Sequence, residues 1–415
     1  MSTKPLSVEC RNVILRNMEA NIRFRLTLQC PALKPTEMAV PLKIDYLNTF
    51  ENGFKINEHL YTFGIFREYP KGAKIPLLHQ EENELLGGSY EDLDEFGVSY
   101  NSEKTLAQRI NDSQRSIESA EQNLSFAVKY SVENEIEMYG NELERERTNL
   151  MTLLNKRDNV LPSYSFCIQF SVSSPNWDFT EKLAYNMKIS EALLKFSKLF
   201  FGFPRSQVFV KKWLFENQLA IETTPSLKFH VQDIVSNQSF LQDLDNVIDA
   251  KSYPLRCLEI KKCKGDMRNF SHPLAKSADK LIINGMIEKE IVSNLPNKEV
   301  ELRNLDLNHV QIIREVIKNW IENGREIGAS FSFQIVKSKV VKIMDQLEMV
   351  TEEYGGIRVS QRSIMIPFNY ASEILISHDP AVIFTEGGYY DQFENGFHAI
   401  NQNDRGVIKV TVSPL

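Results

Sequence analysis

Apolar residues near the start of the chain recur at helical spacing. Val13, Ile14, Met18 and Leu26 follow this pattern, which predicts two short helices between residues 5 and 33. Pro31 prevents a helix from continuing past about residue 30. Two helices of this length bury little surface by themselves. We therefore expect that apolar side chains not packed on the rest of the chain bind a partner.

The next stretch changes to residues typical of strands. IDYLNTF (44–50) and LYTFGIF (60–66) flank the turn-forming pair Asn52 and Gly53, which predicts a β-hairpin within residues 42–69. Residues 71–100 combine four glycines with many acidic residues. This composition predicts a long irregular loop, and loops of that length often bind something.

Residues 103–157 are almost free of proline and glycine and predict a long helical arm. Apolar residues recur three, four or seven positions apart, but Gly140, Glu146 and Arg147 interrupt the seam. The seam is then too short for the three or four clean heptads of a coiled coil. We expect a solvated helix packed along the body, and whether the arm self-associates stays open.

After Pro162 the pattern alternates between short strands and helices. The clearest helix is predicted over residues 309–322, with Asn308 as N-cap and Gly324 as stop, and a second over 338–350. Strands separated by single helices indicate parallel β-α units. The strands are expected to finish as antiparallel neighbours from Gly356 onward.

Two segments of this body share the L-x-x-L-x-L spacing of leucine-rich repeats. The residues are Leu255, Leu258 and Ile260 in one copy, and Leu302, Leu305 and Leu307 in the other. The predicted fold class is therefore α/β: a small helical N-terminus, a β-hairpin, a long helical arm, and an open, curved, leucine-rich-repeat-like β/α body.

Composition and charge narrow the function classes. Hydrophobic residues make up 42% of the 415 residues and charged residues 25%, as in ordinary soluble domains. The net charge of −7 offers no basic excess for nucleic acid, and the longest apolar run is too short to cross a membrane. The N-terminus has no secretory h-region, and the five cysteines are irregularly spaced. We expect reduced thiols and a protein of the cytoplasm or nucleus.

Motifs for common chemistries do not occur in the sequence. The patterns G-x-x-x-x-G-K-[ST], G-x-G-x-x-G, H-E-x-x-H and G-x-S-x-G are missing, and the seven histidines have no neighbours at metal-ligand spacing. We therefore expect no catalytic, cofactor or metal site, and an enzyme is the least favoured class. An aromatic, glycine-rich stretch at residues 387–397 suits either a binding loop or an ordinary turn.

Several stretches together resemble a known family. VECRNVILRNMEANIRFRLTLQCPALKPTEMAVPLKIDYL (8–47), INEHLYTFGIFREYPKG (56–72), SYEDLDEFG (89–97), WIENGREIGASFSFQI (320–335) and GGIRVSQRSIMIPFN (355–369) are similar to a nematode-expanded family. Its members have an F-box-like N-terminus followed by an F-box-associated region. The N-terminal segment departs from the family pattern in being short and in lacking a clear third helix with its customary aromatic residue.

The resemblance implies a protein-binding adaptor. An F-box docks on the Skp-type linker subunit of a cullin-RING ubiquitin ligase, while the remaining domain captures a target protein. The positions that match the docking residues of an F-box are Pro5, Leu6, Val13, Ile14, Met18, Phe24 and Leu26. An alternative is a binding or sequestering module, derived from F-box proteins, that has no role in a ligase.

The expected domains are residues 1–40 (F-box-like segment), 41–100 (hairpin and loop), 101–158 (arm) and 159–415 (target- or partner-binding region). In a β/α layer the strand face opposite the helices is the expected target surface. If Leu258 and Leu302 point inward, Glu259, Lys261 and Arg303 are predicted to be exposed together on neighbouring strands. A merely solvated sheet face is the alternative.

Overall fold

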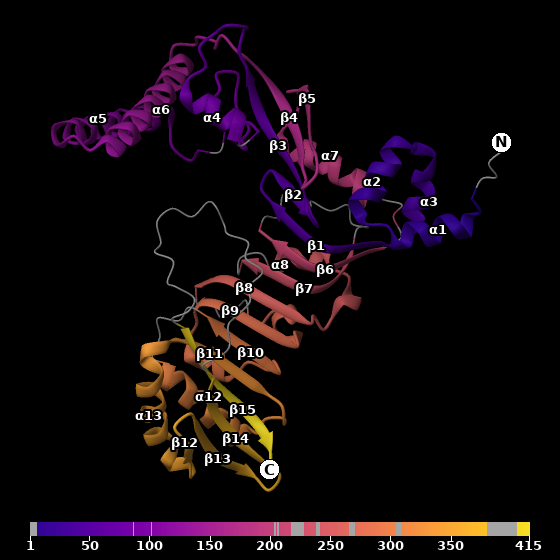
Figure 1. Ribbon diagram of the computed structural model, residues 1–415, viewed down its shortest axis with the longest axis vertical. Coiled ribbons are helices and arrows are strands. Elements are labelled where there is room, and N and C mark those ends of the chain that lie inside the picture. The colour runs from indigo at the N-terminus through magenta and orange to yellow at the C-terminus, as the bar shows by residue number, and fades with distance from the viewer. Residues whose placement is uncertain are drawn as a thin grey trace. The chain divides into compact units, whose positions relative to one another are not determined.

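The chain folds into two units in the computed structural model, which describes residues 6–85, 87–100, 102–202, 205, 207–216, 228–237, 241–264, 270–303, 309–379 and 405–415 (Figure 1). Unit 1 comprises residues 1–40, 46–206 and 217–224. Unit 2 comprises residues 41–45, 207–216 and 225–415. The sequence segments predicted as F-box-like region, hairpin and arm therefore all lie mainly in unit 1.

Unit 1 begins with the two predicted helices. They are α1 (Val8–Asn17) and α2 (Ala20–Gln29), and the Ser7 side chain caps α1 by accepting from the Cys10 amide. A turn of 3-10 helix, η1 (Pro31–Leu33), and a third short helix, α3 (Lys34–Ala39), follow. The prediction was that a clear third helix with an aromatic residue is lacking. A third helix is present, but its sequence, KPTEMA, contains no aromatic residue. Pro35 stands in the first turn of α3, where a helix does not need its N–H.

Five antiparallel strands form the sheet of unit 1. They are β1 (Leu42–Phe50), β2 (Gly53–Ile56), β3 (His59–Glu68), β4 (Ser165–Ser173) and β5 (Asp178–Ala184). The predicted turn at Asn52 is present, but β1 pairs with β2 and not with β3. A second turn at Asn57, whose φ is +53°, turns the predicted hairpin into a three-stranded meander. The first residues of β1, up to Asp45, belong to unit 2.

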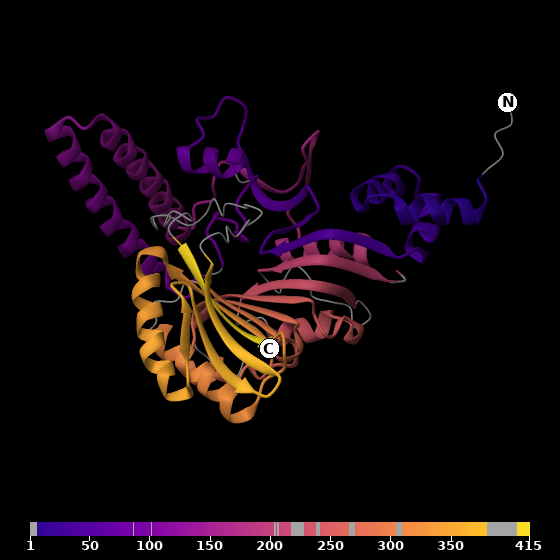
Figure 2. The ribbon, with the colours of Figure 1, turned by 60° about the horizontal axis from the view of Figure 1, so that its bottom comes forward.

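Helices complete unit 1. The predicted irregular loop contains α4 (Leu77–Leu85). The predicted arm is a helical hairpin of α5 (Leu106–Tyr130) and α6 (Glu133–Arg157), because the chain reverses at Ser131, which is in the left-handed conformation (Figure 2). Helix α7 (Ile189–Phe201) packs on β3 and contributes Phe196 and Phe200 to an aromatic core with Phe54.

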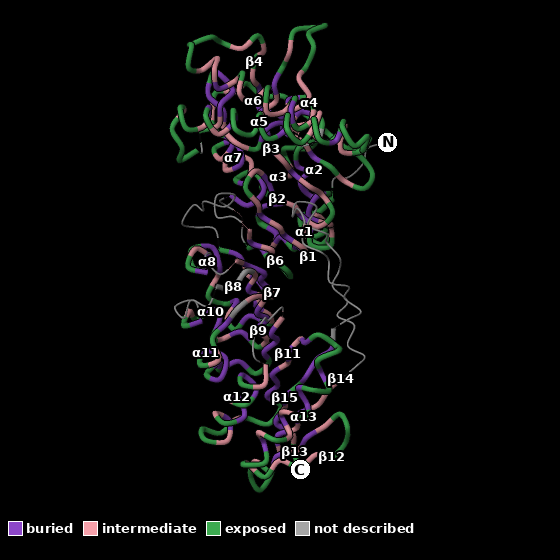
Figure 3. Tube along the Cα trace, turned by 90° about the vertical axis from the view of Figure 1, so that its left-hand side faces the viewer, coloured by how far each residue is buried: buried purple, intermediate pink, exposed green. Residues whose placement is uncertain are grey.

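Six parallel strands form the first part of the unit 2 sheet, in sequence order. They are β6 (Val208–Phe215), β7 (Phe229–Asn237), β8 (Cys257–Lys264), β9 (Lys280–Met286), β10 (Glu299–Arg303) and β11 (Ser330–Val336). Between them lie α8 (Leu241–Val247), η4 (Ala250–Ser252), α10 (Pro273–Ser277), α11 (Lys289–Ser293) and α12 (His309–Asn323). Figure 3 shows that the outer turns of α8 and α11 carry exposed positions. The predicted parallel β-α units are confirmed, and so is the helix end at Gly324, whereas Asn308 lies outside the described residues.

The sheet of unit 2 finishes with the predicted antiparallel strands. After η5 (Lys337–Lys339), α13 (Val340–Thr351) and η6 (Glu352–Tyr354) come β12 (Ile357–Ser360), β13 (Ser363–Asn369), β14 (Ser372–Asp379) and β15 (Arg405–Pro414). Strand β15 pairs with β11, and the order continues through β14 and β13 to β12. The fold is thus mixed α/β with an open sheet.

One buried row of side chains runs across the strands of unit 2. In register order it consists of Ile234, Leu258, Leu281, Val300 and Phe331, all at most 1% exposed. This row recurs at unequal intervals along the chain, so no fixed sequence period marks it. Register also shows that the two L-x-x-L-x-L segments are not equivalent, since Leu302 aligns with Ile260 through Ile283 on β9. Leu305 and Leu307 lie outside the described residues.

Candidate partner-binding surfaces

The N-terminal helices expose a set of apolar side chains to solvent. We call the set the α1–α2 apolar surface. It consists of Leu6, Val8, Val13, Ile14, Ile22 and Leu28, which are each 45–65% exposed. Val13 lies nearly opposite the buried Leu15 on α1, and Ile14 lies to one side of it, since successive helix residues are about 100° apart. Several large exposed apolar side chains on one short segment are typical of a protein-binding surface.

The seven predicted linker-binding residues divide between this surface and the interior. Leu6, Val13 and Ile14 are exposed, and Met18 and Leu26 are half-buried. Pro5 lies outside the described residues. Phe24 is buried, and its ring centroid lies 4.1 Å from that of Phe200 on α7. Phe24 is therefore a core residue of unit 1, and a partner cannot touch it without disturbing that core.

A buried charge cluster fixes α2 and α3 to the body of unit 1. The Glu37 carboxylate accepts two hydrogen bonds of 2.8 Å from Arg205, and Arg23 Nη2 lies 2.8 Å from its Oε1. The side chains of Arg23, Glu37 and Arg205 are 1%, 2% and 1% exposed. Burial lowers the pKa of Arg23, and the neighbouring Glu37 opposes that shift. We call this set the Arg23–Glu37–Arg205 cluster.

A second polar network joins the start of α2 to the strands. The Glu19 carboxylate caps α2 by accepting from the Asn21 and Ile22 amides. The Asn21 side chain donates to the Ile56 carbonyl at 3.0 Å, and the Tyr61 hydroxyl donates to Asn21 Oδ1 at 2.8 Å. Burial raises the pKa of Tyr61, so its hydroxyl keeps the proton it donates. The N-terminal segment of α1, α2 and α3 is consequently built into unit 1.

The predicted target-binding residues lie on the unit 2 sheet face opposite the buried row. Glu259 and Lys261 are on β8 and Arg303 is on β10, so β9 separates them and they are not on neighbouring strands. All three are half-buried and not fully exposed. The expectation of free exposure was wrong. Glu259 and Arg303 approach each other across β9, and both belong to a polar network on this face.

Glu301 is the centre of this polar network. Lys280 Nζ lies 2.8 Å from its Oε2, and Arg303 Nε donates to Oε1 at 2.7 Å. Asn284 on β9 donates to Glu259 at 2.7 Å, and an Arg303 nitrogen lies 3.7 Å from the same carboxylate. Burial alone raises the pKa of Glu301, but the hydrogen bonds from Lys280 and Arg303 outweigh it and hold that pKa below its ordinary value. Glu301 is therefore ionised at neutral pH.

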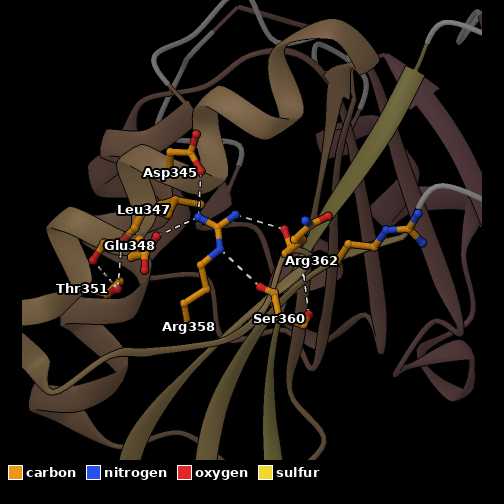
Figure 4. Close-up of polar contacts among 8 residues, drawn as sticks. Asp345, Leu347, Glu348, Thr351, Arg358, Ser360 and Arg362 are labelled. Carbon is orange, nitrogen blue, oxygen red and sulfur yellow. Dashed lines mark hydrogen bonds and ion pairs between the residues drawn. The ribbon is translucent and has the colours of Figure 1, made fainter.

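A further polar cluster ties the last strand of the sheet to α13. Arg358 on β12 donates to Asp345 and Glu348 of α13, both at 2.7 Å, and to the carbonyl oxygens of Ser360 and Gln361 (Figure 4). On the opposite face of the same strand, Ile357 and Val359 are exposed. The cluster holds a four-residue strand in place while these two apolar side chains face solvent.

Unit 1 contains a cavity of about 720 Å³ next to a buried histidine. Its lining includes Tyr69, His79 and Tyr164, and the Tyr69 hydroxyl lies 2.6 Å from His79 Nδ1. Burial, and to a smaller degree Arg67, lowers the pKa of His79 to about 3. The imidazole is therefore neutral at physiological pH and acts as a hydrogen-bonding group in the wall of the cavity.

No group of three or more His, Cys, Asp or Glu side chains that could hold a metal ion occurs among the described residues. No helix in the described part of the chain is long and apolar enough to span a membrane. The four described cysteines are free thiols, and burial raises the pKa of Cys257 to about 11.

Sequence reasoning missed the Arg23–Glu37–Arg205 cluster, although one signal for it was present. Arg23 stands with Ala20, Phe24 and Thr27 on the buried side of α2, where a charged residue requires a buried partner. Its partner Arg205 is far away in sequence, so nothing local identifies the pair. The Arg358 cluster likewise combines residues of two elements that a sequence scan treats separately.

Comparison with known proteins yields one family match. A family model described as "Domain of unknown function (DUF3557)" matches residues 188–337, which run from α7 through β11 to η5. The match does not include the N-terminal segment that resembles an F-box. No curated protein and no solved structure matches the chain.

Proposed function

We propose that this protein is a protein-binding adaptor of the cytoplasm or nucleus. In this proposal the α1–α2 apolar surface docks on the Skp-type linker subunit of a cullin-RING ubiquitin ligase. The unit 2 sheet, regarded as a leucine-rich-repeat-like body, captures a target protein through the polar face around Glu259, Lys261 and Arg303. The exposure of Val13 and Ile14, together with the resemblance of the segment to an F-box, is the observation that supports the proposal.

Two further features support docking on the linker subunit. They are the presence of the third helix, α3, and the attachment of α2 and α3 to the rest of unit 1. An F-box-like unit must hold its docking helix rigidly, and α2 and α3 are held by the Arg23–Glu37–Arg205 cluster. The outer side of α1 stays available, because its buried side is occupied by Leu15. Consecutive parallel strands in unit 2, with helices between them, support the comparison with a solenoid, whose strand face is a common binding surface.

The experiment is affinity purification with two variants that separate the two roles. Val13→Asp with Ile14→Asp places charges on the α1–α2 apolar surface without touching Phe24, so it should abolish capture of the linker subunit and keep target proteins. Lys261→Glu changes the polar face without breaking the Glu301 network and should lose target proteins while keeping the linker. Tyr370→Asp, at a fully exposed position of unit 2, is the matched control and should lose neither.

A second candidate is a binding or sequestering module without a ligase role. The burial of Phe24 favours it, because the F-box-like segment then serves as part of the unit 1 core. The ligase role is excluded, and this candidate stands, if the intact protein captures no Skp-type subunit but still captures target proteins that Lys261→Glu loses. Deleting residues 1–40 is a poor test, since it would remove the partners of Arg205 and Phe200.

A further inference from the structure

Among the described residues, the contacts that anchor the α5–α6 hairpin to the rest of unit 1 lie at one end of the hairpin. At its base, Ile110 of α5 and Leu153 of α6 pack with Phe96 and Val98 in a buried apolar cluster. Farther along α6, Arg145 donates to both oxygens of Glu81 on α4, at 2.7 and 2.5 Å. At the other end of the hairpin α5 passes into α6 at Ser131, and among the described residues no other helix or strand forms this end (Figures 1 and 2).

The seam between the two helices consists largely of small residues on the α5 side. Ser113, Ala120 and Ala127 are buried at intervals of one heptad, which lets the helices approach closely. The Ser113 hydroxyl donates to Glu146 Oε2 at 3.2 Å, and Arg147 donates to Glu121 at 2.8 Å. Two helices that pack through small residues do not require large apolar side chains at the free end of the hairpin. The packing of the hairpin therefore does not explain the apolar residues found there.

The free end nevertheless carries a group of exposed apolar side chains. We call this group the hairpin tip. It consists of Phe126, Val128, Tyr130, Val132 and Met138, which are each 37–60% exposed. The rings of Phe126 and Tyr130 lie one helical turn apart with their centroids 4.5 Å from each other. The outer side of the first half of α5 is polar by contrast, with Asn111, Gln114 and Glu118 exposed.

The charge around the hairpin tip is mostly negative, and the exception is Lys129, whose Nζ lies 5.5 Å from the centroid of the Tyr130 ring. Glu133, Glu135 and Glu137 follow the turn at the start of α6, and Lys129 is the one cationic residue in the sequence between Arg115 and Arg145. Glu133 and Glu135 stabilise the helix N-terminus through its dipole, but Glu137 lies beyond the first turn. An apolar aromatic patch with an acidic border is complementary to an apolar pocket bordered by lysine and arginine.

We propose that the hairpin tip is a docking site for a partner protein whose apolar pocket has a basic rim. Phe126 and Tyr130 are the anchors, since rigid aromatic side chains commonly dominate binding energy at interfaces. The acidic residues repel anionic membranes and nucleic acid, and they repel a second copy of the same tip. This site is distinct from the α1–α2 apolar surface and from the unit 2 sheet face, so it does not rest on the adaptor proposal.

The first test uses synthetic peptides as defined probes for the full-length protein. One amphipathic helical peptide has leucine on one face and lysine on the other, and a matched peptide has glutamate in place of lysine. Calorimetric titration should show at least tenfold tighter binding of the leucine/lysine peptide. Phe126→Ser with Tyr130→Ser should reduce that binding at least tenfold, whereas Met151→Ser, at an exposed position nearer the base of the same arm, should leave it unchanged.

Each of the following results would overturn the proposal. The first is equal binding of both peptides, or equal loss in the Met151→Ser control. The second is tip-dependent binding to vesicles of phosphatidylcholine and phosphatidylserine, which would assign the tip to a lipid surface. The third is tip-dependent dimerisation in sedimentation velocity, which would assign it to a second copy of the chain. A photo-crosslinker at position 126 should then join the tip to a lysine- or arginine-bordered apolar segment of one cellular protein, and a crosslink to an acidic segment would contradict the assignment.

Discussion

Single residues in this protein combine charge with almost complete burial, and Glu37 is the clearest example. Its carboxylate is the common partner of Arg23 and Arg205, so one side chain joins α3 to α2 and to the segment after α7. An ion pair of this kind is costly to break on one side, because the remaining charges stay buried without compensation. The position thus controls the attachment of α2 and α3 to the rest of unit 1.

Replacement of Glu37 by glutamine is expected to destabilise unit 1 strongly. Two buried guanidinium groups would lose their carboxylate, an effect of about 3–5 kcal/mol. Hydrogen exchange measured by mass spectrometry should show lost protection in α2 and α7. Glu9→Gln on the exposed side of α1 is the control and should leave protection unchanged. Unaltered exchange in Glu37→Gln would show that the cluster does not hold the segment.

His79 makes the stability of unit 1 depend on pH. Its folded pKa of about 3 lies below the ordinary value of 6.5, so between these values the unfolded state binds a proton that the folded state does not. Stability therefore falls as the pH drops below about 6.5, by about 1 kcal/mol between pH 7 and pH 5.5. Chemical denaturation of the wild type and of His79→Gln at pH 7 and pH 5.5 checks this. The free energy of unfolding should fall between the two pH values in the wild type only.

Tyr69→Phe is the matched control for His79. It removes the same hydrogen bond but keeps the imidazole buried, so it should lower stability at both pH values and retain the slope. A slope that persists in His79→Gln would assign the pH dependence to other groups.

Individual elements were predictable where local patterns decide them. Helix α12 followed from its apolar stripe and from Gly324, and the parallel strands followed from their short apolar runs. Turns without glycine or proline were missed. Ser131 and Asn57 both adopt positive φ, and neither residue type marks that conformation reliably in sequence. The missed turns changed one predicted helix into a hairpin and one predicted hairpin into a meander.

Candidate surfaces were less predictable than elements, for a physical reason. Exposure depends on what packs against a side chain from elsewhere in the chain. Phe24 matched a docking position but is buried by α7, and Arg303 was expected in solvent but bonds to Glu301 and reaches toward Glu259. Val13 and Ile14 are exposed as docking residues must be, although no pattern in α1 alone distinguishes them from core residues.

The bounds of the family match do not coincide with the bounds of the two structural units. Residues 188–337 include α7, which belongs to unit 1, and omit the antiparallel strands β12–β15 of unit 2. A fragment of these residues would expose Phe200 and would leave β11 without its neighbour β15. An uncovered strand edge of this kind is a site of aggregation.

We therefore expect the fragment 188–337 to aggregate when it is expressed alone. A fragment of residues 207–415 keeps the β11–β15 pairing and omits α7, so it should be more soluble and should show a cooperative thermal transition by circular dichroism. Both fragments lack residues 41–45, so that loss does not distinguish them. A monomeric, cooperatively folded 188–337 fragment would show that the matched segment is a self-sufficient domain.

The shared strand β1 has a consequence for biosynthesis. Its first residues, up to Asp45, belong to unit 2, where the Leu42 amide donates to the Gln207 carbonyl at 2.9 Å. On the ribosome, Leu42 and Ile44 emerge roughly 10–30 s before that partner, at translation rates of roughly 5–20 residues per second. During this interval two side chains that end up fully buried have no strand to pair with. Unit 2 therefore reaches its full set of strands only after β6 has been made, and residues 207–415 alone lack the first residues of β1.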